Sequence, residues 1–434
     1  MNRLLGALPV LAFLLIFSLS TGALAAGLPA APPAQLGFSP ERLKRIDALM
    51  QRYTEQQKLA GMTIAIARDG KLAYLHSEGM ADIAAGRPIR QDTIFRFYSM
   101  SKPITAVAAL QLVEQGKLRL DDALAEHLPE FRDVKVYAGE NADGSMKLEA
   151  PAKPIRIRDL FTHTSGFTYA GMFDQTPVGA AYETADIMRA DRTLQEFSKV
   201  IAGLPLTIQP QTTYNYGVST DILGRVIEVV SGEPFDAYLR AHVFEPLGMA
   251  DTAFTVPADK LERFAEIYEA KPGGGLQPVA DDEVRTRFRA DAGARLNSGG
   301  GGLTSTVGDY LRFSQMLLNG GELDGVRILG PKTVALMTAP ALPMDRMGAM
   351  AAFMPGYTTG LGVAVLVDLG RSELPGSVGE FNWAGAASTY FFIDPKEKLI
   401  AILLTQHFPP TQYPLREELK AITYQALVEA RDVD

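Results

Sequence analysis

The chain has 434 residues, of which 47% are hydrophobic and 21% charged, as in an ordinary globular protein that buries a large core. Its 42 basic and 50 acidic residues give a formal net charge of −8 without a basic cluster, which argues against a nucleic-acid partner. There is no cysteine, so packing without disulfides must stabilise the fold. The length predicts one large two-lobed unit or two domains.

Residues 1–26 have the order of a secretory signal peptide. One early cation, Arg3, precedes an apolar run over about residues 4–18, and Ala23-Leu24-Ala25 form a small-x-small cleavage site. The run is short and contains Pro9, which favours cleavage over a retained membrane anchor. We therefore expect an exported protein, periplasmic or secreted, with no stable membrane anchor after cleavage.

The N-terminal part of the mature chain predicts a helix and a β-hairpin. A Pro/Ala-rich linker is expected over residues 27–38, and Ser39 is suited to cap the helix that follows. Residues 62–67 and 71–76 are predicted to be strands around Asp69-Gly70, a dipeptide that favours a tight hairpin turn.

The C-terminal part repeats this arrangement. Strands are predicted over residues 388–393 and 399–406. A final helix follows, with an apolar face formed by Leu415, Leu419 and Ile422. Helical patterns dominate between the two ends.

Strands at both ends and helices in the middle predict an α/β (α+β) fold: a mainly antiparallel sheet flanked by N- and C-terminal helices, with an inserted all-α lobe. We assign the sheet lobe to residues 39–93 and 298–434, and the helical lobe to residues 94–297. The polar run 137–147 is expected to be a surface excursion of the helical lobe.

Several motifs of known catalytic chemistry are absent from the sequence. The five histidines lack metal-ligand spacing and there is no thiolate, so neither a metal nor a cofactor is expected. The nearest approach to a Gly-x-Ser-x-Gly elbow, residues 217–221, lacks the second glycine. The glycines at 299–302 are not followed by Gly-Lys-Ser/Thr, so we interpret them as tight backbone packing instead of a phosphate loop.

One tetrad with catalytic potential remains, Ser99-Met100-Ser101-Lys102. Pro103 is tolerated only near a helix start, so a buried helix must begin close to Ser99, and Ser99 and Lys102 then share one face. A serine hydroxyl needs a neighbouring base to become a nucleophile, and a buried lysine can serve. By itself the tetrad more often marks a capping serine beside a solvated lysine, so the flanking sequence must decide.

The flanking sequence resembles the serine β-lactamase and penicillin-binding-protein superfamily, and within it the class C-like branch that includes family VIII carboxylesterases. The segments that carry the resemblance are residues 95–122, 155–167, 216–232, 301–317 and 381–406. They span nearly all of the mature chain. The resemblance implies a β-lactamase/transpeptidase-like fold and a serine hydrolase that needs no cofactor.

The resemblance also implies roles for individual residues. Ser99 is the nucleophile and Lys102 is its base. The family's second element, a tyrosine that shares the proton relay, falls on Tyr216, with Tyr214 as the competitor. The backbone N–H groups of Ser99 and Ala386 form the oxyanion hole.

The family's third element is a strand tripeptide, often Lys-Thr-Gly or His-Thr-Gly, and here it is Trp383-Ala384-Gly385. Gly385 would let the strand approach the substrate. Penicillin-recognising members usually have an asparagine two residues after the tyrosine, where this chain has Val218, and a cation where it has Trp383. Because apolar side chains cannot hold the carboxylate of a β-lactam, these four residues predict a substrate-binding wall for neutral carboxylic esters.

Two further groups of residues have open interpretations. The methionines at 344, 347, 350 and 354 form either a soft rim for an acyl chain or ordinary packing. His163 lies in one of the family-like segments, and we interpret it as a structural residue of the helical lobe.

The sequence therefore predicts an exported serine hydrolase that cleaves small-molecule carboxylic esters through an acyl-enzyme. The same residues could instead act on a β-lactam, a D-amino-acid peptide or a linear amide, or transfer the acyl group to an amine or alcohol. From a different class, the chain could be a non-catalytic binding or sensor protein of the cell envelope. The sequence does not give the oligomeric state.

Overall fold

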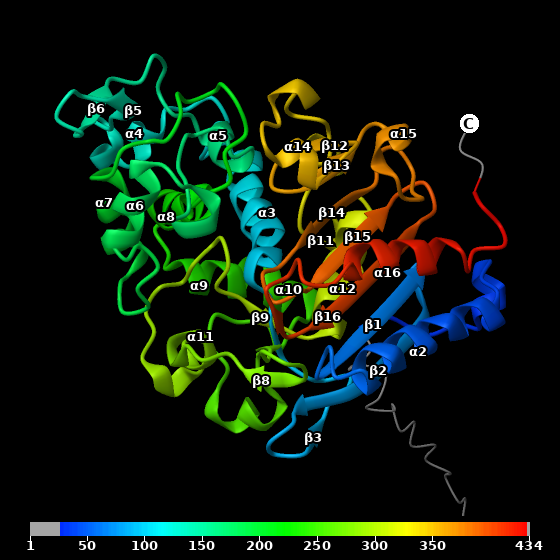
Figure 1. The fold of residues 1–434 in the computed structure, drawn as a ribbon. Helices are drawn as coiled ribbons and strands as arrows, with labels where there is room; N and C mark the ends of the chain where they lie inside the picture. Colours follow the sequence, from blue (N-terminus) through cyan, green and yellow to red (C-terminus); the bar gives the residue numbers. More distant parts are fainter. Residues whose placement is uncertain (1–26, 432–434) are drawn as a thin grey trace, which may run out of the picture.

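A computed structural model describes residues 27–431 of the chain, so the predicted signal peptide lies outside the described residues. An eight-stranded sheet forms the centre, with the order β12-β13-β14-β15-β16-β1-β2-β3 and antiparallel neighbours throughout. Figure 1 shows that these strands come from both ends of the chain. Their bounds are β1 (Gly61–Arg68), β2 (Lys71–Asp82), β3 (Arg87–Pro88), β12 (Tyr357–Thr359), β13 (Ala364–Leu366), β14 (Phe381–Ala384), β15 (Tyr390–Asp394) and β16 (Leu399–Thr405).

The two predicted hairpins form the middle of the sheet. Asp69 and Gly70 both have positive φ, 55° and 73°, which confirms the tight turn between β1 and β2. β2 is longer than predicted and reaches Asp82, because its last residues pair with β3. β1 pairs with β16, with Ile64 opposite Leu403, so the two ends of the chain are joined at the centre of the sheet.

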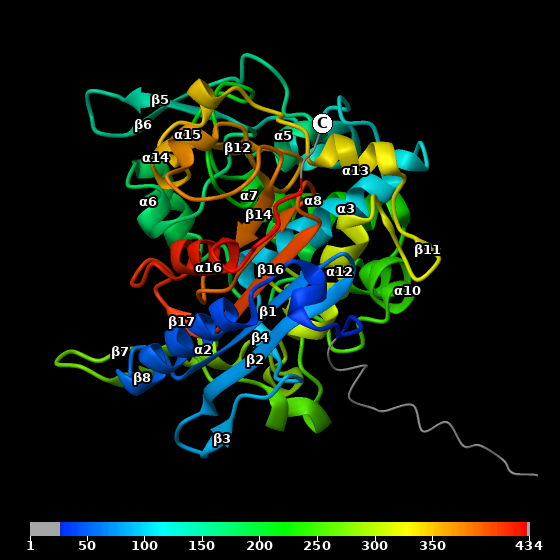
Figure 2. The ribbon, with the colours of Figure 1, turned by 90° about the vertical axis from the view of Figure 1, so that its right-hand side faces the viewer.

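Helices cover both faces of the sheet. α2 (Pro40–Glu55) and α16 (Leu415–Tyr424) lie together on one face and α12 (Val307–Leu318) lies on the other (Figure 2). Ser39 caps α2 as predicted, because its side chain accepts a hydrogen bond from the Arg42 backbone N–H at 3.3 Å.

Residues 27–38, expected to be a linker, lie against the folded body. Leu28, Leu36 and Phe38 are buried, and the Ala31 backbone N–H donates to the Leu72 carbonyl of β2 at 3.0 Å. Apolar side chains and this hydrogen bond therefore make the stretch an integral part of the sheet lobe.

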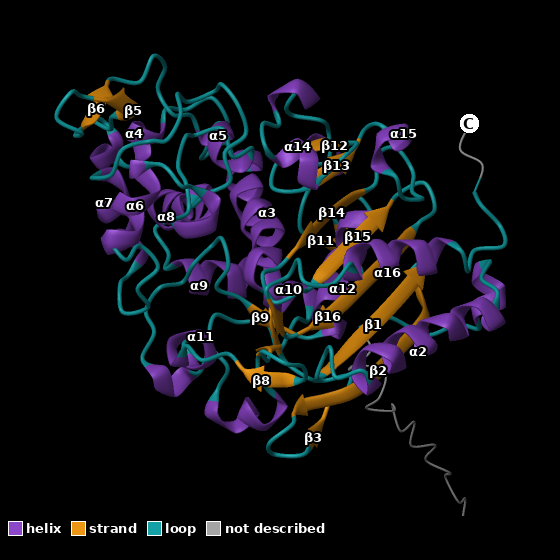
Figure 3. Ribbon diagram, viewed as in Figure 1, coloured by secondary structure: helices purple, strands orange, loops and turns teal. Residues whose placement is uncertain are grey.

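The middle of the chain contains most of the helices, and Figure 3 shows them gathered beside the large sheet. Their bounds are α3 (Ser101–Glu114), α4 (Leu124–His127), α5 (Ile157–Phe161), α6 (Pro177–Thr184), α7 (Leu194–Ala202), α8 (Ser219–Ser231), α9 (Phe235–Leu239), α10 (Glu245–Leu247) and α11 (Asp282–Thr286). Three short helices lie later in the chain: α13 (Pro331–Met337), α14 (Met350–Phe353) and α15 (Leu369–Ser372). Within residues 27–431, no helix is long and apolar enough to cross a membrane.

The middle region is not wholly helical, which corrects the expectation of an all-α lobe. The polar run 137–147 forms most of an exposed two-stranded hairpin instead of a plain loop, because the strands pair around a turn in which Gly144 has positive φ. The short strands are β4 (Phe95–Arg96), β5 (Val136–Glu140), β6 (Met146–Glu149), β7 (Tyr268–Ala270), β8 (Leu276–Pro278), β9 (Thr304–Ser305), β10 (Glu322–Leu323), β11 (Val326–Arg327) and β17 (His407–Phe408).

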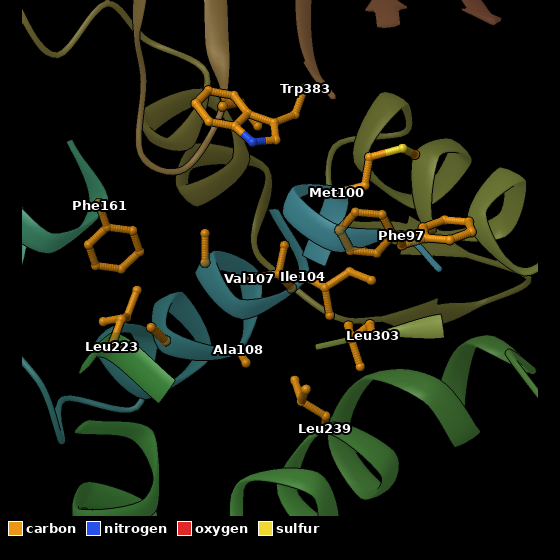
Figure 4. Close-up of a cluster of buried hydrophobic side chains, with 14 of the residues drawn as sticks. Phe97, Met100, Ile104, Val107, Ala108, Phe161, Leu223, Leu239, Leu303 and Trp383 are labelled. Carbon is orange, nitrogen blue, oxygen red and sulfur yellow. The ribbon is translucent and has the colours of Figure 1, made fainter. Parts of the chain in front are cut away.

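α3 is buried on all sides, which fixes its position between the sheet and the other helices. It packs most extensively on α8. Figure 4 shows Ile104, Val107 and Ala108 of this helix among side chains that include Leu223 of α8 and Leu303. A helix that is apolar all round is held by packing in every direction, so the residues at its N-terminus have fixed positions.

Candidate active site

Ser99 lies in a single turn of 3₁₀-helix, η2 (Tyr98–Met100), that leads directly into α3. The predicted helix start close to Ser99 is thus confirmed. Tyr98 has φ 45°, a conformation that costs a non-glycine residue free energy and must be held by its surroundings. The Tyr310 hydroxyl, which donates to the Met100 carbonyl at 3.0 Å, is one contact that holds this turn.

Lys102 and Tyr216 converge on Ser99. Lys102 Nζ lies 3.2 Å from Ser99 Oγ, and the Tyr216 hydroxyl lies 2.7 Å from the same oxygen. The amine also lies over the Tyr216 ring, 4.8 Å from its centre, and its side chain is only 1% exposed. Ser99 Oγ therefore has two groups within the distance that direct proton transfer requires.

Tyr214, the competing tyrosine, has a different environment. It is buried against Leu342 and Met347, and its ring lies parallel to that of Tyr216 with the centres 6.5 Å apart. Burial raises the pKa of Tyr214 well above its usual value. The structure thus brings the hydroxyl of Tyr216, and not that of Tyr214, to the serine.

Two further oxygen atoms hold the amine of Lys102. The Gly300 carbonyl accepts a hydrogen bond from Nζ at 2.7 Å, and the Tyr169 hydroxyl lies 3.4 Å away. Both groups are tied to Asp221, a completely buried carboxylate that accepts from the Gly300 N–H at 3.1 Å and from the Tyr169 hydroxyl at 3.2 Å. Asp221 therefore positions both partners of the amine.

Sequence reasoning missed Tyr169 and Asp221. The position of Asp221, directly before the apolar residues Ile222 and Leu223, was a signal, because a carboxylate that is buried needs dedicated partners. Tyr169 lies in a loop without periodicity, so no local pattern identifies it. Burial, and then the nearby Asp221 carboxylate, raise the pKa of Tyr169 well above its usual value, so its hydroxyl keeps its proton and donates it to a hydrogen bond.

Within the run 299–302, Gly299, Gly300 and Gly302 pack tightly beside the site, as predicted, and Gly301 has only ordinary contacts. A Cβ atom at Gly300 would overlap a carboxylate oxygen of Asp221 and lie 2.8 Å from the Tyr169 hydroxyl. The missing side chain lets the Gly300 carbonyl reach Lys102.

The tripeptide that begins at Trp383 ends β14 beside the site. The indole ring lies 6.2 Å from the Tyr216 ring and stacks on the His163 ring at 6.3 Å, with the planes 6° apart. A Cβ atom at Gly385 would overlap the Phe97 carbonyl. Gly385 therefore permits close packing on the turn that holds Ser99, and its approach to a substrate stays a prediction.

Two residues expected in the substrate-binding wall point elsewhere. Val218 is completely buried in the main core at the start of α8. Ala384 follows Trp383 in the strand, so its side chain faces the opposite side of the sheet, where it packs in the apolar cluster under α2 and α16. In this structure neither side chain lines the cavity beside Ser99, and Trp383 and Gly385 do not line it either.

His163 packs behind the site. Its ring centre lies 4.9 Å from that of Tyr216, its backbone φ is 53°, and it is 1% exposed. Burial, and then the charge of Lys102, lower the pKa of His163 well below its usual value. A neutral ring packed behind Tyr216 fits a structural residue, and it contacts the ring of Tyr216 directly.

A cavity of about 450 Å³ opens beside Ser99. Aromatic side chains form much of its wall: Tyr98, Tyr169, Phe173, Tyr182, Tyr216, Phe288 and Phe408. Ala386 also lines it. Within residues 27–431, the backbone N–H groups of Ser99 and Ala386 have no backbone acceptor, so both are available to a substrate oxygen.

The methionines of residues 344–354 do not line this cavity. Met347 is buried against Tyr214, and Met354 packs on the main core. Packing is therefore the interpretation that the structure supports for Met347, Met350 and Met354, whereas Met344 lines a separate hollow. In the described part of the chain, no group of three or more acidic or histidine side chains is placed to hold a metal ion.

Comparison with known proteins agrees with this fold. Residues 46–425 match the family described as Beta-lactamase. Esterase EstB of Burkholderia gladioli is 32% identical over 382 residues, which cover 83% of this chain and 89% of that protein. Lovastatin esterase of Penicillium rubens is 29% identical over 395 residues, 86% of this chain and 96% of that protein.

A solved structure extends the comparison. EstCE1, described as a hydrolase with promiscuous acyltransferase activity, superposes with a TM-score of 0.75 at 27% identity and covers 88% of this chain and 99% of its own. The fold is thus β-lactamase/transpeptidase-like, as expected. The chain belongs to the β-lactamase family, and it is a serine hydrolase with esterases among its relatives.

The glycine loop generates a test with a matched control. In Gly300→Ala the added Cβ displaces Asp221 or Tyr169 and thereby moves Lys102, so we expect kcat for ester hydrolysis to fall by about 10- to 100-fold. In Gly301→Ala the nearest atom to the new Cβ is 3.6 Å away, an ordinary contact, so activity is retained. Steady-state kinetics on p-nitrophenyl butyrate, with circular dichroism to verify folding, measures both. Equal activity in the two variants would contradict the role given to Gly300.

Proposed function

We propose that this protein hydrolyses carboxylic esters through an acyl-enzyme formed on Ser99. The observation that carries the proposal is the approach of Lys102 Nζ and the Tyr216 hydroxyl to Ser99 Oγ, at 3.2 and 2.7 Å. The esterases among its relatives support the same class of reaction.

In the acylation step, Ser99 Oγ attacks the ester carbonyl as its proton passes to Lys102 or Tyr216. The negative charge that develops on the carbonyl oxygen is stabilised by the backbone N–H groups of Ser99 and Ala386, two residues that line the cavity. The alcohol then leaves with a proton from Tyr216, whose hydroxyl lies beside the reacting oxygen. The C–O bond to the alcohol is broken and an ester to Ser99 remains.

Deacylation repeats these events with water as the nucleophile. Lys102 and Tyr216 accept a proton from the water, the same N–H groups stabilise the oxyanion, and Ser99 Oγ recovers its proton as the carboxylic acid departs. The fixed positions of Gly300, Tyr169 and Asp221 hold the amine in place through both steps.

The preference for esters over β-lactams depends on the environment of Trp383. Position 383, at the start of the third element, carries an indole ring that packs against His163 and Tyr216, so this position supplies no charge to a β-lactam carboxylate. An aromatic cavity wall suits an acyl chain or an aryl alcohol.

We also propose that the protein is exported, from the order of charge, apolar run and small residues in residues 1–26. N-terminal sequencing of the protein recovered from the periplasm or medium tests this. A mature N-terminus near residue 26 supports export, and a chain that retains Met1 in the cytoplasmic fraction opposes it.

Substrate preference is tested by rates on p-nitrophenyl esters and on nitrocefin, with Ser99→Ala as the control. We expect ester hydrolysis that Ser99→Ala abolishes, and slow or no nitrocefin turnover, because the cation that would hold its carboxylate is missing from the third element. Rapid nitrocefin turnover without ester hydrolysis would overturn the proposed substrate.

The two neighbouring tyrosines provide a matched test of the proton relay. Tyr216→Phe removes the hydroxyl at Ser99 Oγ, so kcat/KM is expected to fall by about 10²- to 10⁴-fold, and Lys102→Ala by at least as much. Tyr214→Phe removes a hydroxyl that does not reach the serine, so its kcat/KM stays near the wild-type value. Near-normal kcat/KM in Tyr216→Phe or Lys102→Ala would be incompatible with the mechanism.

A further inference from the structure

The cavity beside Ser99 contains a cation without a partner. Arg287, just after the end of α11, lines this cavity, and its side chain is half-buried. Within residues 27–431, no carboxylate oxygen lies within 4.0 Å of its guanidinium group. Half-burying an unpaired guanidinium costs free energy, which a bound anion would offset.

The arginines on either side of Arg287 are both paired. Arg285 binds Glu266 at 2.8 Å, and Arg289 binds Asp291 at 2.8 Å. Neither of these two lines the cavity of Ser99. Of three arginines spaced two residues apart, the one that faces the cavity is therefore the one left available to a ligand.

Arg287 is connected to the nucleophile through two aromatic rings. Its guanidinium carbon lies 5.8 Å from the centre of the Phe288 ring, and that ring packs edge-on against Tyr98 at 5.5 Å. Tyr98 directly precedes Ser99. Burial raises the pKa of Tyr98, and the charges of Arg96 and Arg287 oppose that rise.

The cavity also contains carboxylates, contributed by a different element. Glu183 lies at the end of α6 and Asp186 just beyond it, and both line the cavity. Positive charge thus comes from the α11 side and negative charge from the α6 side. A substrate with an anionic end is attracted to Arg287 and repelled from the acidic side, so the two sides together set its orientation.

We propose that Arg287 is a specificity-determining residue that binds the carboxylate of an anionic ester, an ester that carries a second, ionised carboxyl group. This inference rests on the proposed ester hydrolysis at Ser99. A guanidinium group forms two parallel, charge-assisted hydrogen bonds with a carboxylate. An ordinary alkyl ester has no carboxylate to accept them. Position 383 carries no cation, so the positive charge comes instead from Arg287 in the cavity wall, where a bound carboxylate would have a different geometry.

Two pairs of substrates test the proposal and show on which side of the ester the carboxylate lies. For the acyl side, mono-p-nitrophenyl glutarate is compared with p-nitrophenyl pentanoate, which has a methyl group in place of the carboxylate. For the alcohol side, 4-(pentanoyloxy)benzoate is compared with phenyl pentanoate. Each pair gives a ratio of kcat/KM for the anionic ester over the neutral ester.

In Arg287→Met, which keeps an unbranched side chain but removes the charged guanidinium group, we expect this ratio to fall by about 10- to 100-fold in one pair, with the neutral ester changed by less than about threefold. Arg289→Met is the matched control, because that arginine is paired and lies outside the cavity, and its ratio stays at the wild-type value. An unchanged ratio in Arg287→Met for both pairs, or an equal fall in Arg289→Met, would overturn the proposal.

A binding measurement separates failure of this inference from failure of the proposed reaction. Trp383 is the single tryptophan of the chain and lies beside Tyr216, so its fluorescence can report occupancy of the site. We expect Ser99→Ala to bind at least one of the two anionic esters at least about tenfold more tightly than Ser99→Ala/Arg287→Met does. If the wild type hydrolyses no ester, the proposed reaction fails. Tighter binding that depends on Arg287 would still support the anion site in that case. Equal binding by the two variants would still overturn the anion site.

Discussion

The buried amine of Lys102 is the constraint on which the rest of the structure depends. It contacts Ser99 Oγ, the Gly300 carbonyl and the Tyr169 hydroxyl in a place that water hardly reaches. Removing an amine from water costs free energy unless such acceptors are provided. Three features provide these acceptors: the burial of α3, the glycine loop at residues 299–302 and the buried carboxylate of Asp221.

The parts of this arrangement that depend on neighbours in the sequence could be predicted. The Asp69-Gly70 turn, the Ser39 cap and the start of a buried helix near Ser99 follow from local backbone preferences. The fold could also be predicted, because strands at both ends of the chain and helices between them leave few ways to build one sheet. The family-like segments added Tyr216, which spacing alone did not distinguish from Tyr214.

The parts that depend on contacts through space could not be predicted. Tyr169 and Asp221 are 52 residues apart and meet only when α8 packs beside the loop that carries Tyr169. Val218 occupies a position at which the family resemblance implied a substrate-binding residue. Its side chain is buried in the core instead, because the start of α8 points it inward. The free cation of Arg287 is visible only once the partners of its neighbours are known. The local pattern together with the family-like segments thus pointed to Ser99, and tertiary packing decided what surrounds it.

The central claim is that Ser99 is the nucleophile of a working hydrolase instead of a remnant in a silent binding protein. Intact-mass measurement after treatment with a fluorophosphonate, followed by peptide mapping, tests it most directly, because this reagent forms a covalent bond only with an activated hydroxyl. We predict one adduct per chain on the peptide that contains Ser99, and none in Ser99→Ala. No adduct on the wild type, or an undiminished adduct in Ser99→Ala, would contradict the account.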